Sequence, residues 1–559
     1  MWPFLEKQRR LLARENGAVI KDWGGKLSIA LVYPNTYHTG MSNLAIHSLY
    51  KIFNDHPQVV CERAFLPDPQ TLLEHRRTRT PILSMESQRP LHEFDVVAFS
   101  ISFQNDFLNI IPMLSLCSVP YRASKRTDEH PLIIAGGCAV SMNPHPLDEI
   151  FDAFVLGEAE EIAGEMIPIM SERLSHEQTR EALSKISGIY TPHPHPLPKG
   201  ERARSLLPLP FGERERYLLP LPPAYAKASA GKRGERAGVR VTRRIVKDLD
   251  SWPTQTVVYT PHTEFGDMHL IEMSRGCPRH CNFCATPCLY TPYRARNIDA
   301  LLKMISTGLS FRKRFGLIGS DLLSHKAFPE TVNHIHDNGA TFSPSSLRAD
   351  EVDDNVATVL ARSGHKSISL GIEAASERLR SSLGKRFSNE RILETVKALA
   401  SHGICTLRLY FMIGLPGETE EDINAIAELS ALIQSTIESA APKSSRSSSI
   451  TLTVNPFVPK PFTPFERMPF ASEKILKEKI KILRRLTKSS KGILVHVEPV
   501  VSATCDAVFS RGDNKLISFL ERSFEKDSPR KALSALHEDD LRHLERGFEK
   551  EEELPWLQF

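Results

Sequence analysis

Short continuous apolar runs and helical apolar spacing alternate along the first third of the chain. Continuous runs are typical of strands that are buried on both faces, and they occur at 28–33, 95–101, 132–135 and 151–156. Helical spacing follows several of them, for example at 41–53. This alternation predicts a parallel sheet with helices on both faces. We therefore expect a flavodoxin-like doubly wound domain over residues 1–185, with a site at the carboxyl ends of its strands.

Strand patterns return at fairly regular intervals in the second half of the chain. They lie at 269–273, 316–319, 342–348, 367–373, 406–414 and 449–455, with helical patterns such as 389–402 and 420–434 between them. Six such units predict a partial (β/α)6 barrel of the TIM type over residues 251–468, with all strand ends on one face. Residues 469–559 are charged and have a helical pattern, and we expect a small helical C-terminal region there.

The segment 186–250 differs in composition from both halves. Nine prolines lie between Pro192 and Pro223, and the run 200–210 recurs at 212–222 with nine of eleven residues identical. A short proline-dense repeat cannot form a packed core, so we predict a disordered insertion or linker. A Pro-rich docking ligand is the functional alternative.

Composition and charge limit the classes of protein. The 559 residues are 41% hydrophobic, as in globular chains, and no apolar run is long enough to span a membrane. Nine cysteines, four of them in one stretch, indicate metal ligation in a reducing compartment, so we expect a cytoplasmic protein. Residues 192–246 carry twelve Lys or Arg and four Glu, so the net charge of this segment is twice the +4 of the whole chain. The remainder is therefore slightly acidic, and its charge does not favour nucleic acid as a partner.

Three cysteines lie within eight residues directly after a predicted strand: Cys277, Cys281 and Cys284. Three thiolates can bind three irons of a 4Fe–4S cluster and leave the fourth iron open to a small chelating molecule. Because Cys288 adds a fourth thiol, a zinc site and a ferredoxin-type cluster are alternatives. Zinc ribbons separate their ligand pairs widely, and ferredoxins use Cys-x2-Cys-x2-Cys-x3-Cys-Pro, whereas here the first gap is three residues and Leu289 follows Cys288.

The spacing Cys-x3-Cys-x2-Cys, with Phe283 just before the last cysteine, resembles the cluster loop of the radical S-adenosylmethionine (SAM) superfamily. The resemblance implies that the amino and carboxylate groups of SAM chelate the open iron and that Phe283 lies beside the adenine. It also implies one-electron cleavage of SAM to methionine and a 5'-deoxyadenosyl radical, with a reductant such as flavodoxin or ferredoxin as partner.

Further predicted strand ends resemble SAM-binding elements of that superfamily. In Gly319-Ser320-Asp321, which stands where many members have Gly-Gly-Glu, the candidates for the SAM amino group are Gly319 and Ser320. Arg348 and Glu373 are candidates for the ribose and methionyl ends, with a buried Glu–Arg pair that only supports the barrel as the alternative. Residues 414–419 resemble a glycine loop beside the adenine, which adds Gly414, Gly417 and Glu418; a plain turn capped by Thr419 is the alternative.

The first domain, with its segment 33–43, resembles the cobalamin-binding-type domain that precedes many radical SAM cores. Members that ligate cobalamin through histidine use Asp-x-His-x-x-Gly, whereas this chain has Asn35-x-x-His38-x-Gly40, so both the acidic residue and the spacing depart. Cobalamin as a cofactor and His38 as its ligand are separate questions. A loop histidine that packs against or caps the next helix is the alternative role of His38.

The order of domains resembles that of cobalamin-dependent methyltransferases, which implies methyl transfer to an unactivated carbon. Methylthiolation is the second hypothesis and would need another cluster on Cys61, Cys117 and Cys138, for which buried structural thiols are the alternative. A non-catalytic iron–sulfur or SAM-binding scaffold is the third. The Pro- and Phe-rich tract 455–465 resembles the same position in both enzyme groups and is a candidate substrate wall. The substrate is not indicated.

Overall fold

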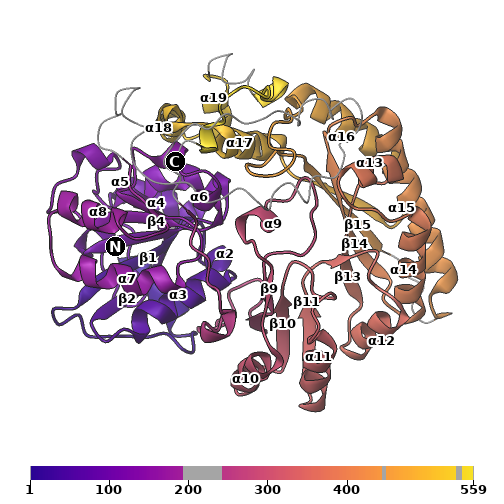
Figure 1. Cartoon of the computed structure of the whole chain (residues 1–559), viewed down its shortest axis with the longest axis horizontal. Helices are drawn as coiled ribbons and strands as arrows, with labels where there is room; N and C mark the ends of the chain where they lie inside the picture. The colour runs from indigo at the N-terminus through magenta and orange to yellow at the C-terminus, as the bar shows by residue number, and fades with distance from the viewer. Residues whose placement is uncertain (1, 193–241, 444–448, 537–543, 558–559) are drawn as a thin grey trace.

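The computed structural model describes residues 2–192, 242–443, 449–536 and 544–557. An N-terminal domain lies beside a larger arc of strands and helices, and the C-terminal helices α17 (Val500–Arg511) and α18 (Ile517–Lys526) lie across one end of both (Figure 1). Most of the predicted insertion, residues 193–241, falls outside the described residues, so the disorder predicted there stays a prediction. At the ends of the predicted segment 186–250 this prediction is wrong, because Ile189–Tyr190 forms a strand of the N-terminal sheet and Val246 and Leu249 are buried. No described helix combines the length and the apolar character that a membrane span requires.

The N-terminal domain has a six-stranded sheet in the order β2-β1-β3-β4-β5-β6. Its strands are β1 (Leu27–Tyr33), β2 (Val59–Phe65), β3 (Val96–Ser100), β4 (Leu132–Gly136), β5 (Ala153–Val155) and β6 (Ile189–Tyr190). The first five are parallel and only β6 is antiparallel. This order confirms the predicted flavodoxin-like doubly wound sheet.

Helices cover both faces of this sheet, with α1 (Trp2–Leu12) preceding it. They are α2 (Tyr37–Met41), α3 (Leu44–Asp55), α4 (Pro69–Thr78), α5 (Ile110–Leu116), α6 (Cys138–Met142), α7 (Glu160–Ser171) and α8 (His176–Ser184). The helical pattern at 41–53 proves to be two helices, because the Asn43 side chain accepts a hydrogen bond from the Ala45 N–H and begins α3 anew.

The second half forms an open arc of parallel strands in two sheets, β7-β10-β11 and β12-β13-β14-β15-β16. Their bounds are β7 (His269–Glu272), β10 (Arg314–Ile318), β11 (Thr341–Pro344), β12 (Leu347–Arg348), β13 (Ser367–Glu373), β14 (Thr406–Ile413), β15 (Ser449–Pro456) and β16 (Ile493–Val497). The arc agrees with the predicted partial barrel. Two details differ: the expected strand 342–348 divides into β11 and β12, and β16, from the region expected to be helical, extends the sheet beyond β15.

Helices lie between these strands and on the outside of the arc (Figure 1). They are α10 (Ile298–Leu309), α11 (Phe328–Asp337), α12 (Asp354–Arg362), α13 (Glu377–Ser382), α14 (Asn389–Ser401), α15 (Glu420–Ala440) and α16 (Glu473–Thr487), and α19 (Pro529–Leu533) follows α18. Each strand–helix–strand unit returns the chain to the same edge of the sheet. The strand ends therefore share one mouth, as predicted.

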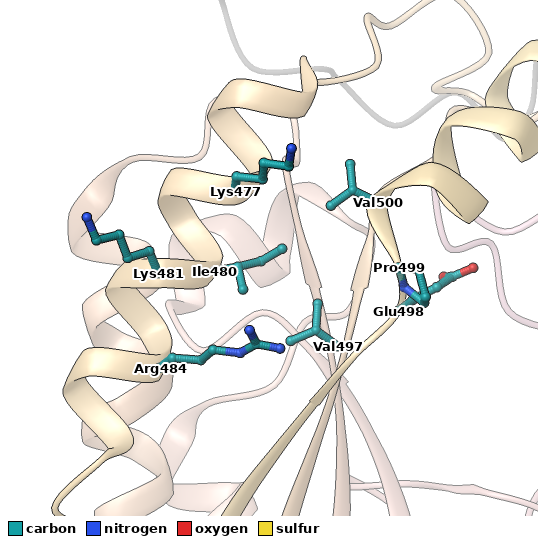
Figure 2. Close-up of a pocket in the computed structure, with 8 residues that line it drawn as sticks. All are labelled: Lys477, Ile480, Lys481, Arg484, Val497, Glu498, Pro499 and Val500. Carbon is teal, nitrogen blue, oxygen red and sulfur yellow. The ribbon is translucent and has the colours of Figure 1, made fainter. Parts of the chain in front are cut away.

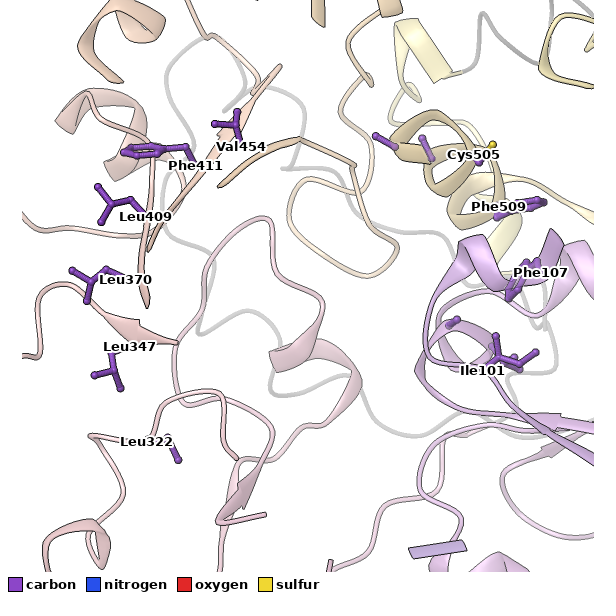
Figure 3. Packing of buried hydrophobic residues seen from close by; sticks show 14 of the residues in the cluster. Ile101, Phe107, Leu322, Leu347, Leu370, Leu409, Phe411, Val454, Cys505 and Phe509 are labelled. Carbon is purple, nitrogen blue, oxygen red and sulfur yellow. The ribbon is translucent and has the colours of Figure 1, made fainter. Parts of the chain in front are cut away.

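The C-terminal helix α17 packs against the N-terminal domain. The ring of Phe509 lies 5.3 Å from that of Phe107, which belongs to the 3-10 segment Gln104–Asn109 after β3. Figure 3 shows Cys505 and Phe509 of this helix beside Ile101 and Phe107. The C-terminal region thus joins the N-terminal domain to the barrel through buried apolar contacts.

Candidate functional site

The predicted cluster loop is a hairpin closed by two short antiparallel strands, β8 (Ser274–Arg275) and β9 (Arg294–Ala295). The loop begins at Gly276, whose φ is +80°. A Cβ atom at Gly276 would lie 2.4 Å from the carbonyl oxygen of Tyr290, so only glycine fits this neck. The short helix α9 (Thr286–Leu289) follows the cysteines inside the same hairpin.

The loop holds the three predicted ligands as partly buried free thiols. Burial raises the pKa of Cys277 to about 11, and the charges of Cys281 and Cys284 act in the same direction. Burial also raises the pKa of Cys281. The thiols are therefore close enough to interact electrostatically, and metal binding would have to displace their protons.

Two neighbouring segments brace the loop through Asn282, which the sequence did not single out. Its backbone N–H donates to the carbonyl of Leu383 at 2.9 Å, and its side-chain amide donates to that of Ser382 at 2.8 Å. The N–H of Phe465, in the tract 455–465, donates to the Asn282 carbonyl at 3.2 Å. Gly384 allows this segment to approach the cluster loop closely, because a Cβ at this position would lie 3.0 Å from the carbonyl oxygen of His280.

Phe283 lies in a small apolar cluster at the barrel mouth. Its neighbours come from the ends of strands, from α13 and its C-cap, and from the tract: Ala374, Leu415, Leu379, Leu383, Phe457 and Phe465, with Met412 and Met468 at the edge. Leu415 belongs to the predicted glycine loop 414–419. The structure therefore brings Phe283 together with that loop and with the predicted substrate wall.

Arg348 and Glu373 lie near the cluster loop but do not pair with each other. Arg348 donates to Asp350 at 2.9 Å, and Glu373 accepts from Lys385 at 2.8 Å. Beyond the effect of burial, the charges of Lys385, Arg348 and Glu373 all influence the pKa of Cys281, which places them around this thiol. The Glu–Arg pair that we considered as a supporting contact is not formed.

The candidates of the glycine loop have local partners. The Gly414 N–H donates to Glu418 at 2.7 Å, and Lys479 of α16 forms an ion pair with the same carboxylate. Thr419 caps α15 as the alternative reading expected, with its N–H donating to Asp422 at 2.8 Å. Gly417 has a φ of +75° and open space where a Cβ would stand. Glu418 therefore holds the glycine loop in place by its contacts with the Gly414 backbone and with Lys479 of α16.

Gly319 and Ser320 follow β10, where they were expected. The Gly319 carbonyl accepts a hydrogen bond from Ser345 at 2.8 Å. Asp321 binds Arg279 of the cluster loop at 2.8 Å, so the acidic residue of this element orients the loop. Although burial alone would raise the pKa of Asp321, hydrogen bonds from Glu351 and Arg279 lower it.

Three buried polar atoms at the neck of the loop have no hydrogen-bond partner among the described residues. They are Ser274 Oγ, Tyr293 OH and Asp321 Oδ1. A Cβ built on Gly319 would lie 3.0 Å from Ser274 Oγ, so this hydroxyl faces the Gly319 element. Buried polar groups usually find partners, and these atoms could hydrogen-bond to a polar ligand beside the cluster loop.

Buried ion pairs hold the cluster hairpin against the N-terminal domain. Glu158 accepts from Arg294 at 2.6 Å and lies 3.2 Å from Arg275, and Glu160 pairs with Arg275 at 2.8 Å. The side chains of Glu158 and Arg294 are 3% and 10% exposed, so this contact is shielded from water and salt. Arg275 immediately precedes the glycine at the loop neck.

The carboxyl edge of the N-terminal sheet faces the same hairpin. The helix α6 packs against α9, and burial raises the pKa of Cys138 while a hydrogen bond with Tyr290 opposes that rise. Asn35 donates to Asp106 Oδ1 at 2.7 Å, whereas Asp106 Oδ2 is buried and has no partner among the described residues. His38 is exposed on α2.

Two protein families match the two halves of the chain. The family "Radical SAM proteins, N-terminal" matches residues 45–192, and "Radical SAM superfamily" matches residues 271–430, which include the cluster loop. The chain belongs to the radical SAM superfamily and is a radical SAM enzyme. Membership implies a 4Fe–4S cluster and SAM as cofactors, and a set of three neighbouring thiols suits the cluster.

Two relatives differ in how much of this chain they cover. An uncharacterized protein of Methanocaldococcus jannaschii is 27% identical over 519 residues, which are 92% of this chain and 94% of that protein. The ribosomal protein uS12 methylthiotransferase RimO of Thermosipho africanus is 23% identical over 176 residues, 29% of this chain and 41% of that enzyme. The second match is therefore partial.

The solved structure of the radical SAM methyltransferase TsrM from Kitasatospora setae, with tryptophan and a SAM analogue bound, has the same fold. It aligns with a TM-score of 0.50 and 15% identity over 90% of this chain and 99% of TsrM. The likeness extends over both domains. At this identity it supports the fold and carries no residue assignments.

Within the described ranges, no three His, Cys, Asp or Glu side chains converge as they would around a single metal ion. A 4Fe–4S cluster requires a different arrangement of ligands, because each thiolate binds its own iron and the sulfurs stay further apart. The three partly buried thiols of the hairpin suit this arrangement. The assignment of Cys277, Cys281 and Cys284 stays a prediction.

The three cysteines of the hypothetical second cluster are not brought together. Cys61 belongs to the apolar cluster on one face of the N-terminal sheet, and Cys117 belongs to the cluster on the other face. Both are fully buried, and Cys138 lies at the carboxyl edge of the sheet. Since the sheet itself separates Cys61 from Cys117, these two thiols cannot bind one cluster in this fold.

Proposed function

We propose that this enzyme cleaves SAM reductively beside a cluster on Cys277, Cys281 and Cys284 and uses cobalamin to methylate a carbon atom. The observation that carries the proposal is the contact between α6, at the carboxyl edge of the N-terminal sheet, and α9 of the cluster hairpin. Ligands of doubly wound domains bind at this edge. A cofactor held there would therefore lie between its own domain and the SAM site.

The polar groups at this edge suit the amide-rich periphery of a corrin ring. Asp106 is 3% exposed, and its Oδ2 can accept a hydrogen bond that no described residue provides. Asn43 and Ser102 are joined by a 2.8 Å hydrogen bond at the same strand ends. Cobalamin would supply the transferable methyl group, and these residues would orient the ring.

His38 is not needed for this arrangement. It lies on the five-residue helix α2, with an exposed side chain, and its sequence context lacks the acidic partner of histidine-ligating domains. In metal-ligating histidines such a partner fixes the tautomer and the orientation of the ring. We infer that cobalamin is held without a histidine ligand.

Methylthiolation is the second candidate because RimO matches part of the chain. The positions of Cys61 and Cys117 on opposite faces of the sheet argue against the further cluster that our hypothesis for this reaction requires. The TsrM fold, shared over 90% of this chain, includes both domains and agrees with the methyl-transfer proposal.

The decisive experiment asks for SAM cleavage and cobalamin separately. Anaerobically reconstituted protein should convert SAM to methionine and 5'-deoxyadenosine when it is reduced. Protein refolded with cobalamin should retain the cofactor through gel filtration, and His38→Ala should leave its visible spectrum unchanged. A changed spectrum would identify His38 as the ligand.

Two other outcomes would replace the proposal. Loss of cobalamin on gel filtration, together with iron and sulfide in excess of one cluster, would favour methylthiolation. Absence of any SAM cleavage in protein that contains a reducible cluster would favour a non-catalytic scaffold.

A further inference from the structure

A groove of about 390 Å³ lies between α16 and the junction of β16 with α17. Its apolar walls come from Ile480, Val497 and Val500. Lys477 and Arg484 extend from α16 toward that junction, one on each side of Ile480 (Figure 2). The groove therefore has an apolar centre bordered by exposed cations, to which Lys481 adds a third positive charge, and Glu498 is the one carboxylate among the described residues that line it.

The helix that forms this wall is strongly basic. From 473 to 491 the chain has eight Lys or Arg and two Glu. Lys477 pairs with Glu473 at 2.6 Å, but both side chains are about half exposed, so the pair is screened and weak. In the described part of the chain, the guanidinium of Arg484 makes no hydrogen bond or ion pair, and the hydrogen bond from the Thr487 side chain goes to the backbone carbonyl of Arg484. Most of this charge is thus available to an anionic partner.

The groove lies at the same end of the barrel as the cluster loop. Because β16 is parallel to β15, its carboxyl end, which forms the groove, is on the mouth side. The helix α16 also contacts the glycine loop: Lys479 pairs with Glu418, and Leu476 lies 2.8 Å from the position of a Cβ on Gly414. The helix α16 therefore has one side in the groove and another in contact with the predicted glycine loop.

We propose that this groove docks a small acidic electron-carrier protein. The inference rests on the proposed SAM cleavage, which requires one electron per event; the carrier is oxidised by one electron and the cluster is reduced by one, and no bond changes at the groove. Complementary charge favours fast encounter, and an apolar centre with a polar rim is typical of protein interfaces. The walls contribute no aromatic ring on which the bases of an RNA could stack.

The test compares two routes of electron delivery to the same reconstituted enzyme. An acidic flavodoxin, reduced beforehand, and dithionite serve as reductants, and cluster reduction is followed by stopped-flow absorbance. The double variant Lys477→Glu/Arg484→Glu should slow reduction by flavodoxin about tenfold or more at low salt, and added salt should shrink this difference. Reduction by dithionite should stay unchanged.

A matched control makes the same two charge reversals on helices far from the groove. Lys303→Glu/Lys397→Glu changes exposed residues of α10 and α14 and should leave both rates at the wild-type level. Equal flavodoxin rates in the groove variant, the control and wild type would overturn the docking site. Loss of poly(U) binding in the groove variant, with its flavodoxin rate intact, would overturn it in favour of RNA. A cluster that dithionite cannot reduce would instead contradict the proposed function.

Discussion

The N-terminal sheet and the five-stranded sheet of the barrel bury their strands differently. Every residue of β1 and β2 is buried, because helices cover both faces of the N-terminal sheet. In β13, β14 and β15 buried residues alternate with partly exposed ones. The buried set faces the outer helices, and the other set, which includes Glu373, faces the lumen. The first sheet is packed throughout, whereas the second keeps one polar, accessible face on which chemistry can be placed.

The largest expected effect concerns the loop above the accessible face. Cys277→Ala, Cys281→Ala and Cys284→Ala should each abolish the 4Fe–4S cluster, because each removes the thiolate of one iron. Cys288→Ala, in the same hairpin, is the matched control and should retain it. Iron and sulfide content with electron paramagnetic resonance measures this. Loss of iron in Cys288→Ala, or zinc in protein purified without oxygen, would refute the ligand assignment.

Substitutions of neighbouring strand residues test the burial comparison itself. In β1, Leu31→Ala and Val32→Ala should both destabilise the fold, the leucine change by about 2–5 kcal/mol. In β15, Leu452→Ala should cost a similar amount, whereas Thr453→Ala, which changes the lumen face, should cost less than about 0.5 kcal/mol. Urea unfolding midpoints measure the difference. Equal losses at Leu452 and Thr453 would show that the lumen is a packed core.

A smaller effect is expected where the barrel braces the cluster loop. Gly384 and Gly364 have similar φ angles, +81° and +79°, so alanine strains both by about 1–3 kcal/mol. Only at Gly384 would the new Cβ meet the loop, at the His280 carbonyl. Gly384→Ala should therefore lower cluster occupancy after reconstitution, and Gly364→Ala should not. Equal iron content in the two variants would argue against the brace.

The smallest expected effect is a pH dependence in the N-terminal domain. Burial raises the pKa of Asp106 from its ordinary value of 3.8 to about 6. The folded state therefore binds more protons than the unfolded state between about pH 4 and 6, and its stability falls as pH rises through this window. Asp106→Asn removes this loss, so its melting temperature relative to wild type should increase from pH 4 to pH 7. A pH-independent difference would show that the carboxyl is solvated.

Charged residues explain why the sequence pattern missed β2. The strand contains Glu62 and Arg63, which break the apolar run, yet both are buried. Arg63 is neutralised by Glu15 and Glu86, and these partners stand 48 and 23 residues away in the chain. The strand β16 was not predicted because it follows a lysine-rich helix and His496 interrupts its apolar run.

The predicted site likewise combines patterns that are local in the sequence with contacts between residues that are far apart in it. The cysteine spacing, Phe283 and the glycine loop are local patterns, and they lie at the expected barrel mouth. The partners of these residues are distant in sequence, as for Glu418 with Lys479 or Asn282 with the Ser382 carbonyl. Only the folded chain brings such pairs together, so spacing alone could not indicate them.

The ion pairs of Glu158 and Glu160 with Arg275 and Arg294 determine how the chain can be divided into fragments. The two acidic residues precede the segment 193–241 and the two arginines follow it, so the buried ion pairs connect the parts on either side. A protein nicked within that segment should elute as one particle at moderate salt. The two fragments, expressed separately, should reassemble by complementation, and the smallest unit able to hold the cluster loop in place would include the N-terminal domain.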